Sequence, residues 1–278
     1  MLCLGAQAQK TKKVTATTTF LAPEFMSPAE AKLRALNQAK VEAIGKEFGM
    51  NVSEVTSSAT ISKHGKDKEV FNVIGGSDIR GEWIETLSEP QYKIEHRDGL
   101  QIVFVTVEGT IREIKGQKPV IDAKILRNGT EPQYVSEQFL DGDEMFMEFS
   151  ASCPGSLLVY MVSDGEAFRL LPYHGQHAES VKITNTDKQI FFSKKHTAPE
   201  FRKMTDEYVL TASVPQELNQ IFVIFSPNNL YKAIDEQKND QLPSELDAVA
   251  FQKWLDRARK QDRDLVVEEK IIVISERD

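Results

Sequence analysis

The stretch LQIVFVTVEGTIREI, residues 100–114, alternates apolar and polar side chains along its length. Successive side chains of a β-strand point to opposite faces of the sheet. This alternation therefore predicts a long strand with one buried face and one solvated face. The apolar set is Val103, Val105, Val107 and Ile111, and the polar set is Thr106, Glu108, Thr110 and Arg112.

The residues just before this strand predict a hairpin. The pair Asp98-Gly99 separates the strand from residues 92–96, and Asp-Gly is a favoured two-residue turn between antiparallel strands. Other stretches rich in β-branched residues predict further strands. These are residues 14–21, 52–62 and 79–87.

A helix is predicted after the first strand. Ser27 can cap it, Pro28 suits its first position, and Glu30 completes a capping box. Gly49 favours a left-handed end. The apolar residues at helical spacing are Ala29, Leu33, Leu36, Ala43 and Ile44, and the alanines at 31, 35 and 39 would let the helix lie close to a sheet. We expect an antiparallel sheet covered by one helix, which is an α+β domain.

A polar break at residues 115–119, KGQKP, divides the chain. Gly and Pro interrupt regular structure, and domain boundaries commonly lie in such stretches. We expect residues 14–115 to form the α+β domain and residues 119–278 to form a mostly-β domain, each folding independently. Residues 1–13 are expected to be the remnant of a signal peptide and a disordered start.

The second part of the chain is nearly all short strands. Asn128-Gly129 and Asp164-Gly165 lie between apolar runs and predict hairpin turns. Residues 221–225 are continuously apolar and predict a central strand covered on both faces. Further strands are expected at residues 144–150, 157–162, 168–171, 190–192 and 208–212. Many short strands with regular turns are typical of a β-sandwich.

A helix and a last strand are predicted near the end of this domain. Ser244 is the expected cap, and Asp247 closes the capping box. The last strand is expected at residues 265–274. The side chains expected on the buried face of the helix are Leu246, Val249, Phe251, Trp254, Leu255 and Ala258. The C-terminal domain is therefore predicted to be a β-sandwich-like domain with one helix near its end.

Spaced motifs of this second part resemble a known family. They are ILRNGT at 125–130, FLDGD at 139–143, LLPY at 170–173, FFS at 191–193, NQIFVIFSPN at 219–228, LP at 242–243 and FQKWL at 251–255. In this order they resemble the domain of unknown function family 4384 over residues 119–275, although Gly155-Ser156-Leu157 replaces the usual Gly-Tyr pair of the third strand. The resemblance implies a bacterial envelope or signalling protein without established catalytic residues, so it transfers no site.

The first part is similar to the N-terminal domain of flagellar assembly protein T and related envelope lipoproteins. Those proteins share an Ala-rich helix and a strand of alternating valines that follows an Asp-Gly pair. Here Asp98-Gly99 and residues 103–107 match that strand. This resemblance also implies an envelope protein.

Composition argues against several classes of partner. The formal charge is −8, and phosphate backbones repel an acidic surface that lacks a basic patch, so we expect no nucleic acid. No run approaches the about 18 apolar residues that mark a transmembrane segment. Cys3 and Cys153 are too few for a disulfide framework.

The N-terminus predicts export. Ala6-Gln7-Ala8 fits the small-x-small rule for signal-peptide cleavage, with the cut between Ala8 and Gln9. Because the apolar region before it is short, a plain disordered N-terminus is the alternative. Cleavage would make the protein exported, either periplasmic or associated with the cell envelope.

The candidate binding surface is a loop containing Tyr173, His174, His177 and Glu179. Pro172 cannot donate to a further ladder bond, so the chain must leave the sheet there, and loops held by a sheet often carry binding residues. Two imidazoles and a carboxylate could hold zinc, but their loop spacing is not the helical i,i+4 geometry of metalloproteases. We expect no metal and no cofactor. The alternative for Tyr173 is that it fills the end of the sandwich.

Two functions fit these patterns. The first is a non-enzymatic bacterial cell-envelope binding or scaffolding protein, whose partner is another envelope protein or a cell-wall component. It is favoured because the chain lacks a Gly-x-Ser-x-Gly elbow, a motif for a cysteine–histidine dyad and a dinucleotide fingerprint. The alternative is an envelope hydrolase, with or without a metal ion, that uses the loop at residues 174–179.

Overall fold

The computed structural model describes residues 11–23, 26–48, 81–97, 100–114, 117–237 and 243–277. The chain divides into two compact units, Met1–Gln117 and Lys118–Asp278. The division lies within the polar break at residues 115–119. The fold class is α+β, as predicted, with a sandwich-like C-terminal unit. The predicted features that lie outside the described residues are Ala8, Gln9, Gly49, the strand at 52–62 and the Asp98-Gly99 turn.

The strand predicted from residues 100–114 is the centre of the first unit's sheet. It is β4 (Leu100–Glu113), which pairs in antiparallel fashion with β1 (Thr11–Ala22) along the full length of β1. On its other side β4 pairs with β3 (Gln91–Arg97) and β2 (Gly81–Thr86). The predicted apolar face is buried, and its members Val103, Val105, Val107 and Ile111 are at most 2% exposed.

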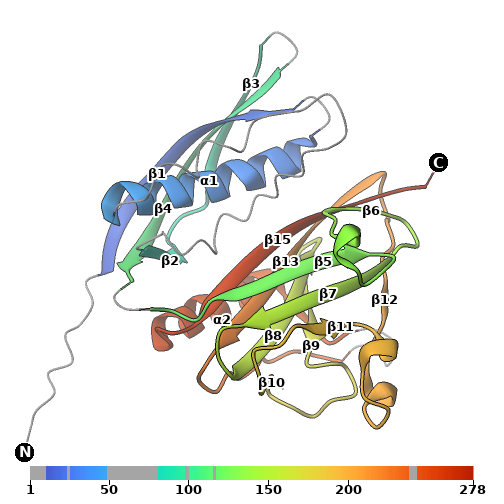
Figure 1. The fold of residues 1–278 in the computed structure, drawn as a ribbon. Helices are drawn as coiled ribbons and strands as arrows, with labels where there is room; N and C mark the ends of the chain where they lie inside the picture. The colour runs from blue at the N-terminus through green and yellow to red at the C-terminus, as the bar shows by residue number, and fades with distance from the viewer. Residues whose placement is uncertain are drawn as a thin grey trace, which may run out of the picture. The chain divides into compact units, whose positions relative to one another are not determined.

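Helix α1 (Pro28–Phe48) packs on the buried face of this sheet (Figure 1). The predicted Ser27 cap is present, because its hydroxyl accepts a hydrogen bond from the Glu30 N–H at 3.2 Å. The Glu30 carboxylate accepts from Arg34 Nε at 2.9 Å. The predicted buried stripe is partly wrong, since Ala29 is exposed. The fully buried row is Ala31, Ala35 and Ala39. These residues recur every four positions and carry no side chain beyond Cβ, so the helix backbone can approach the sheet closely.

The polar face of β4 is not wholly solvated, which corrects the expectation for Arg112. Its side chain is buried and its Nε lies 2.8 Å from Glu82 Oε1. Glu82 is the cross-strand partner of Arg112 in the β2–β4 ladder. Opposite charges that face each other across a ladder attract, so β2 covers this end of the polar face with an ion pair.

The second unit packs a large sheet against a small one. In chain order its strands are β5 (Ile121–Arg127), β6 (Gln138–Leu140), β7 (Glu144–Ala151), β8 (Gly155–Ser163), β9 (Glu166–Leu171), β10 (Val181–Ile183), β11 (Gln189–Phe191), β12 (Tyr208–Val209), β13 (Gln216–Ser226), β14 (Glu245–Asp247) and β15 (Val266–Ser275). The large sheet has the order β14-β9-β8-β13-β15-β6, with β10 also paired to β8. In the small sheet β7 pairs with β5 on one edge and with β11 and β12 on the other.

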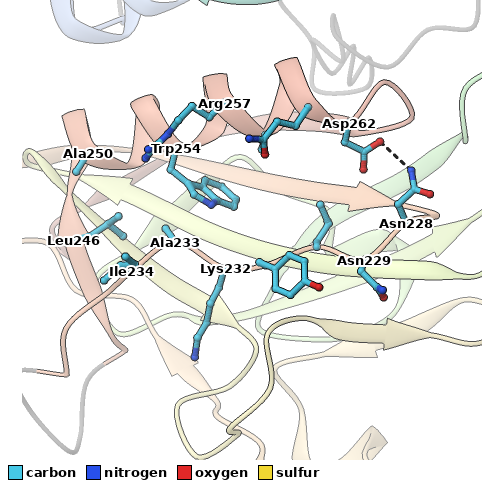
Figure 2. A pocket seen from close by; sticks show the side chains of 14 residues that line it. Asn228, Asn229, Lys232, Ala233, Ile234, Leu246, Ala250, Trp254, Arg257 and Asp262 are labelled. Carbon is cyan, nitrogen blue, oxygen red and sulfur yellow. Dashed lines mark hydrogen bonds between the residues drawn. The ribbon is translucent and has the colours of Figure 1, made fainter. Parts of the chain in front are cut away.

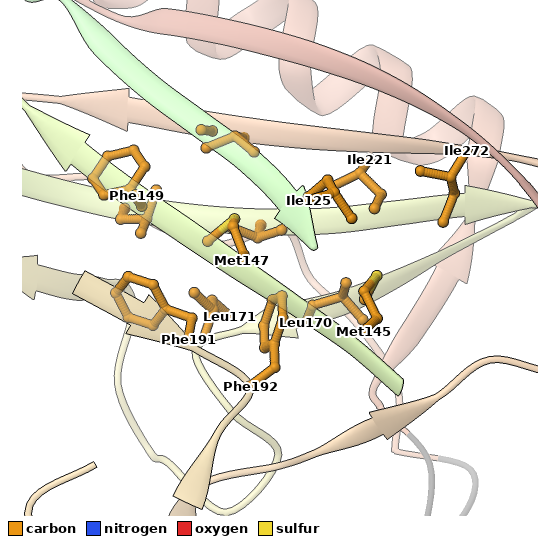
Figure 3. Close-up of a cluster of buried hydrophobic side chains, with 14 of the residues drawn as sticks. Ile125, Met145, Met147, Phe149, Leu170, Leu171, Phe191, Phe192, Ile221 and Ile272 are labelled. Atoms are coloured by element: carbon orange, nitrogen blue, oxygen red, sulfur yellow. The ribbon is translucent and has the colours of Figure 1, made fainter. Parts of the chain in front are cut away.

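Strand β13 is central and covered on both faces, which confirms the prediction from residues 221–225. It lies between β8 and β15. Ile221 and its alternate neighbours face the small sheet and join a core that Figure 3 shows between the two sheets. Phe222 and Ile224 face the other way and pack against helix α2 (Ala248–Gln261). The unit therefore has three layers: small sheet, large sheet and helix.

One predicted hairpin is confirmed and one is wrong. Asp164 and Gly165, with φ of 45° and 84°, join β8 to β9, and this left-handed backbone is what a tight two-residue hairpin requires. Asn128-Gly129 instead leads away from β5 toward β6 in the other sheet. The Asn128 amide explains the difference, because its Oδ1 accepts from the Glu144 N–H at 2.8 Å and ties the chain to β7.

Helix α2 begins later than the sequence predicts. Its cap is Asp247, whose Oδ1 accepts from the Ala250 N–H at 2.9 Å, and residues 245–247 form edge strand β14. The Ser244 hydroxyl instead accepts a hydrogen bond from the Arg169 guanidinium at 2.8 Å. Phe251 is buried as predicted. Val249, in the first turn of the helix, is instead 60% exposed. Within the described ranges no helix has the length and apolar character to cross a bilayer.

Candidate interaction groove

Tyr173, the first residue of the predicted binding loop, lies inside the sandwich. It is 6% exposed, and its hydroxyl accepts a hydrogen bond from the Phe192 N–H at 3.0 Å. The two rings meet edge to face with centroids 6.3 Å apart. Burial raises the pKa of Tyr173 well above its usual value. Tyr173 thus fills the end of the sandwich, the alternative that the sequence had left open.

The other residues of this loop do not converge. The backbone N–H of His174 donates to Asp206 Oδ2 at 2.7 Å, and the residue is half-buried. His177 and Glu179 are exposed. Within the described part of the chain, no group of three or more His, Cys, Asp or Glu side chains is placed to hold a metal ion. The loop therefore presents His177 and Glu179 to solvent as separate side chains.

A serine–histidine pair that the sequence analysis missed lies near this loop. Ser193 Oγ is 3.0 Å from His196 Nδ1. Ser193 is 3% exposed, and its carbonyl accepts a hydrogen bond from the Thr197 hydroxyl. A nucleophile must be able to reach a substrate atom, whereas this hydroxyl is covered and bonds within a local turn. The pair stabilises that turn.

The two tryptophans have different surroundings. Trp83 is a core residue of the first unit, where its Nε1 donates to Thr86 and its ring lies against Gly109. A Cβ on Gly109 would stand 1.9 Å from Trp83 Cζ2, so only glycine fits under this ring. Trp254 is half-buried on α2 and stacks on Phe251 with centroids 5.8 Å apart. Its remaining surface is open to a groove.

That groove runs between α2 and residues 228–234, and we call it the α2 groove. It has a volume of about 690 Å³ (Figure 2). Trp254 projects into it from the helix, and Ile234 and Leu246 lie near one end. At the other end Asn228 Nδ2 donates to Asp262 Oδ1 at 3.0 Å.

The wall at residues 228–234 is held by inward side chains. Leu230 and Ala233 are buried in the layer between the large sheet and α2. The Ala233 N–H donates to the Tyr160 hydroxyl at 3.0 Å. Burial raises the pKa of Tyr160 well above its usual value, so the hydroxyl stays neutral. This irregular segment is therefore fixed to the sheet although it forms no strand.

A buried arginine fixes the chain just beyond this wall. Arg169 on β9 is 3% exposed, and its Nε donates to Asp235 Oδ2. The same guanidinium donates to the Pro172 carbonyl and to the Ser244 hydroxyl. Loss of one partner of a buried ion pair commonly costs about 3–5 kcal/mol. Arg169 therefore holds both the end of the wall and the entry to β14 in place.

Two apolar side chains of this wall face solvent. Tyr231 is 66% exposed and Ile234 is 97% exposed. Full burial of an Ile side chain stabilises by about 1.5–3 kcal/mol, and here that contribution is unused. Exposed apolar side chains gathered at a concave site are typical of interaction surfaces. Tyr231 and Ile234 therefore expose apolar surface beside Trp254 along the lining of the groove.

This groove was not predicted from the sequence. Trp254 was predicted to be a core residue, whereas it is only partly buried, and no role was predicted for Tyr231 or Ile234. Residues 228–234 carry no helical or strand periodicity, so nothing local separates their inward from their outward side chains. The available signal was NNLYKAI itself, an irregular stretch that combines a Tyr and an Ile with polar residues.

Comparison of the chain with protein-family models, curated proteins and solved structures finds no match. The resemblances drawn from the sequence motifs stay predictions.

Proposed function

We propose that the protein is a non-enzymatic cell-envelope binding or scaffolding protein that captures its partner in the α2 groove. The observation that carries this proposal is the exposure of Tyr231 and Ile234 on a wall fixed by Tyr160 and Arg169. An exposed side chain on a fixed backbone loses little freedom on binding, so a partner gains affinity from contact with it.

The groove supports binding more than the loop at residues 173–179 does. Interface anchors are aromatic and apolar side chains that a partner can cover. Tyr173 is covered by the sandwich itself, whereas Tyr231 and the partly exposed Trp254 line the groove. The loop then contributes to the fold through the buried side chain of Tyr173.

The envelope part of the proposal rests on the N-terminal sequence. Cleavage between Ala8 and Gln9 would deliver the mature chain outside the cytoplasm. The partner is then another envelope protein or a cell-wall component. The resemblance of the first part to envelope lipoproteins is consistent with this compartment, and the family that the second part resembles includes envelope proteins.

Capture from native envelope extract tests the proposal. Immobilised full-length protein should retain a partner, and Tyr231→Ala with Ile234→Ser should reduce that retention about tenfold or more, the factor for a loss of about 1.4 kcal/mol. Both side chains are exposed, so the melting temperature should not change. Val209→Ser is the matched control, because Val209 is 58% exposed on β12 of the small sheet. Equal retention by the groove variant and the control would refute the proposal.

A further inference from the structure

Helix α2, which forms one wall of the α2 groove, is basic on an acidic protein, and its residue Arg257 lines the groove. Helix α2, AVAFQKWLDRARKQ, carries four basic residues and one acidic residue, while the whole chain has a formal charge of −8. Lys253, Arg257 and Lys260 are exposed. They are spaced by four and three residues and therefore lie in one row along the helix. We call this row the α2 basic row.

The opposite wall also contains a basic residue. Lys232 and Arg257 both line the groove, one from each wall (Figure 2). Asp262 is the acidic group in the lining, and its two oxygens accept hydrogen bonds from Ser226 and Asn228 at one end. Its charge is thus held at that end, while Arg257 lies on the helix beside Trp254 and the Lys232 side chain points away from the helix (Figure 2).

We propose that the α2 groove takes an extended segment of a partner protein in which carboxylates flank an apolar side chain. This inference rests on the proposed function and names the chemistry of its partner. The apolar side chain contacts Trp254 and Ile234, and a carboxylate pairs with Arg257. Arg257 Nε donates to the Lys253 carbonyl at 3.3 Å. The two terminal amino groups of the planar guanidinium suit this role because they can donate two parallel hydrogen bonds to a carboxylate.

The shape of the site favours a peptide over a lipid surface. A helix that lies on a membrane presents a broad apolar face to the lipid. The apolar face of α2 is turned inward, where Phe251 and Leu255 are buried against the sheet. A groove of about 690 Å³ instead suits side chains of a single extended chain.

Charge complementarity should make this site selective for acidic segments. The acidic surface of the protein repels acidic segments elsewhere, and the α2 basic row attracts them locally. A hydrogen bond to a charged group is stronger than one to a neutral group. We therefore expect about a tenfold preference or more for an acidic segment over its neutral counterpart.

Three synthetic peptides of equal length test the inference. Each places a Phe between flanking residues that are Glu in the first, Gln in the second and Lys in the third. Fluorescence anisotropy of the labelled peptides with full-length protein should rank their affinities Glu, then Gln, then Lys. Arg257→Gln should weaken the Glu peptide about tenfold and leave the Gln peptide unchanged. Lys195→Gln, the same charge change at an exposed position outside α2, should alter neither.

The possible outcomes separate the inference from the proposed function. Equal affinity for the three peptides, or no effect of Arg257→Gln on the Glu peptide, overturns the acidic partner. Co-sedimentation with phosphatidylglycerol vesicles without peptide binding overturns it in favour of a membrane. If envelope capture still depends on Ile234 in these cases, only the inference fails. If capture ignores Ile234, the proposed function fails as well.

Discussion

Asp143 shows how a motif that resembles a ligand loop can instead be part of the fold. The sequence DGDE at residues 141–144 begins like a calcium loop. In the structure the Asp143 carboxylate is 2% exposed. It accepts hydrogen bonds from Asn128 Nδ2, the Leu140 N–H and the Arg277 guanidinium at 2.7–2.8 Å. These donors join β5, β6 and the end of the chain, so the carboxylate fastens this edge of the sandwich.

This arrangement predicts a pH-dependent contribution to stability. Burial alone would raise the pKa of Asp143, but the hydrogen bonds from Asn128, Leu140 and Arg277 together lower it below its ordinary value. At pH values between the lowered pKa and the ordinary pKa, the folded state therefore binds fewer protons at Asp143 than the unfolded chain does. The stabilisation is therefore present above the ordinary pKa of 3.8 and is lost as pH falls through the lowered value.

Replacement of this carboxylate should remove that dependence. Asp143→Asn should lower the free energy of unfolding by about 1–3 kcal/mol at neutral pH, and the difference should shrink in acid. Urea unfolding, followed by Trp254 fluorescence in a Trp83→Phe background, measures it. A difference that is the same at neutral pH and at pH 3 would contradict the account.

At the scale of elements, the alanine row of α1 sets the distance from helix to sheet. Ala35 is fully buried against the β1 and β4 core, whereas Ala29 is exposed. Ala35→Leu should therefore cost about 1–3 kcal/mol by overpacking, and Ala29→Leu should be nearly neutral. Thermal unfolding of the full chain in a Trp254→Phe background, followed by Trp83 fluorescence, compares the two. Equal melting temperatures would show that the helix does not pack through this row.

Elements with a strong local pattern could be predicted from the sequence. The alternation in β4, the apolar run in β13 and the Ser27 cap of α1 each depend on neighbouring residues alone. The Asp164-Gly165 turn belongs with them, because its two residues suit a left-handed backbone.

Elements that depend on distant contacts were mispredicted. Asn128-Gly129 has the composition of a hairpin turn, but its amide bonds across to Glu144. Ser244 is a residue type that commonly caps helices, but its hydroxyl accepts a hydrogen bond from Arg169 on β9. In both cases a tertiary hydrogen bond decides between local options of similar free energy. The α2 groove also depends on distant contacts, because its two walls meet only in the folded chain, and it was therefore not predicted from the sequence.

At the scale of the molecule, the two units have separate cores. The first core contains residues of β1, α1, β2 and β4, and the cores of the second lie on either side of its large sheet. Polypeptides covering residues 10–116 and 118–278 should each be soluble and unfold cooperatively, because each retains its own core. Calorimetry of the two pieces tests this. If either piece is unfolded while the full chain is stable, the units depend on each other.

The central claim is that a partner binds in the α2 groove, and photo-crosslinking tests it most directly. A benzoylphenylalanine at Tyr231 places the reactive group at the groove, and the same residue at His177 places it on the loop first considered from the sequence. Both positions are exposed, so both variants should fold. Irradiation in native envelope extract should give a discrete adduct from position 231 and none from position 177. An adduct from position 177 alone would contradict the account.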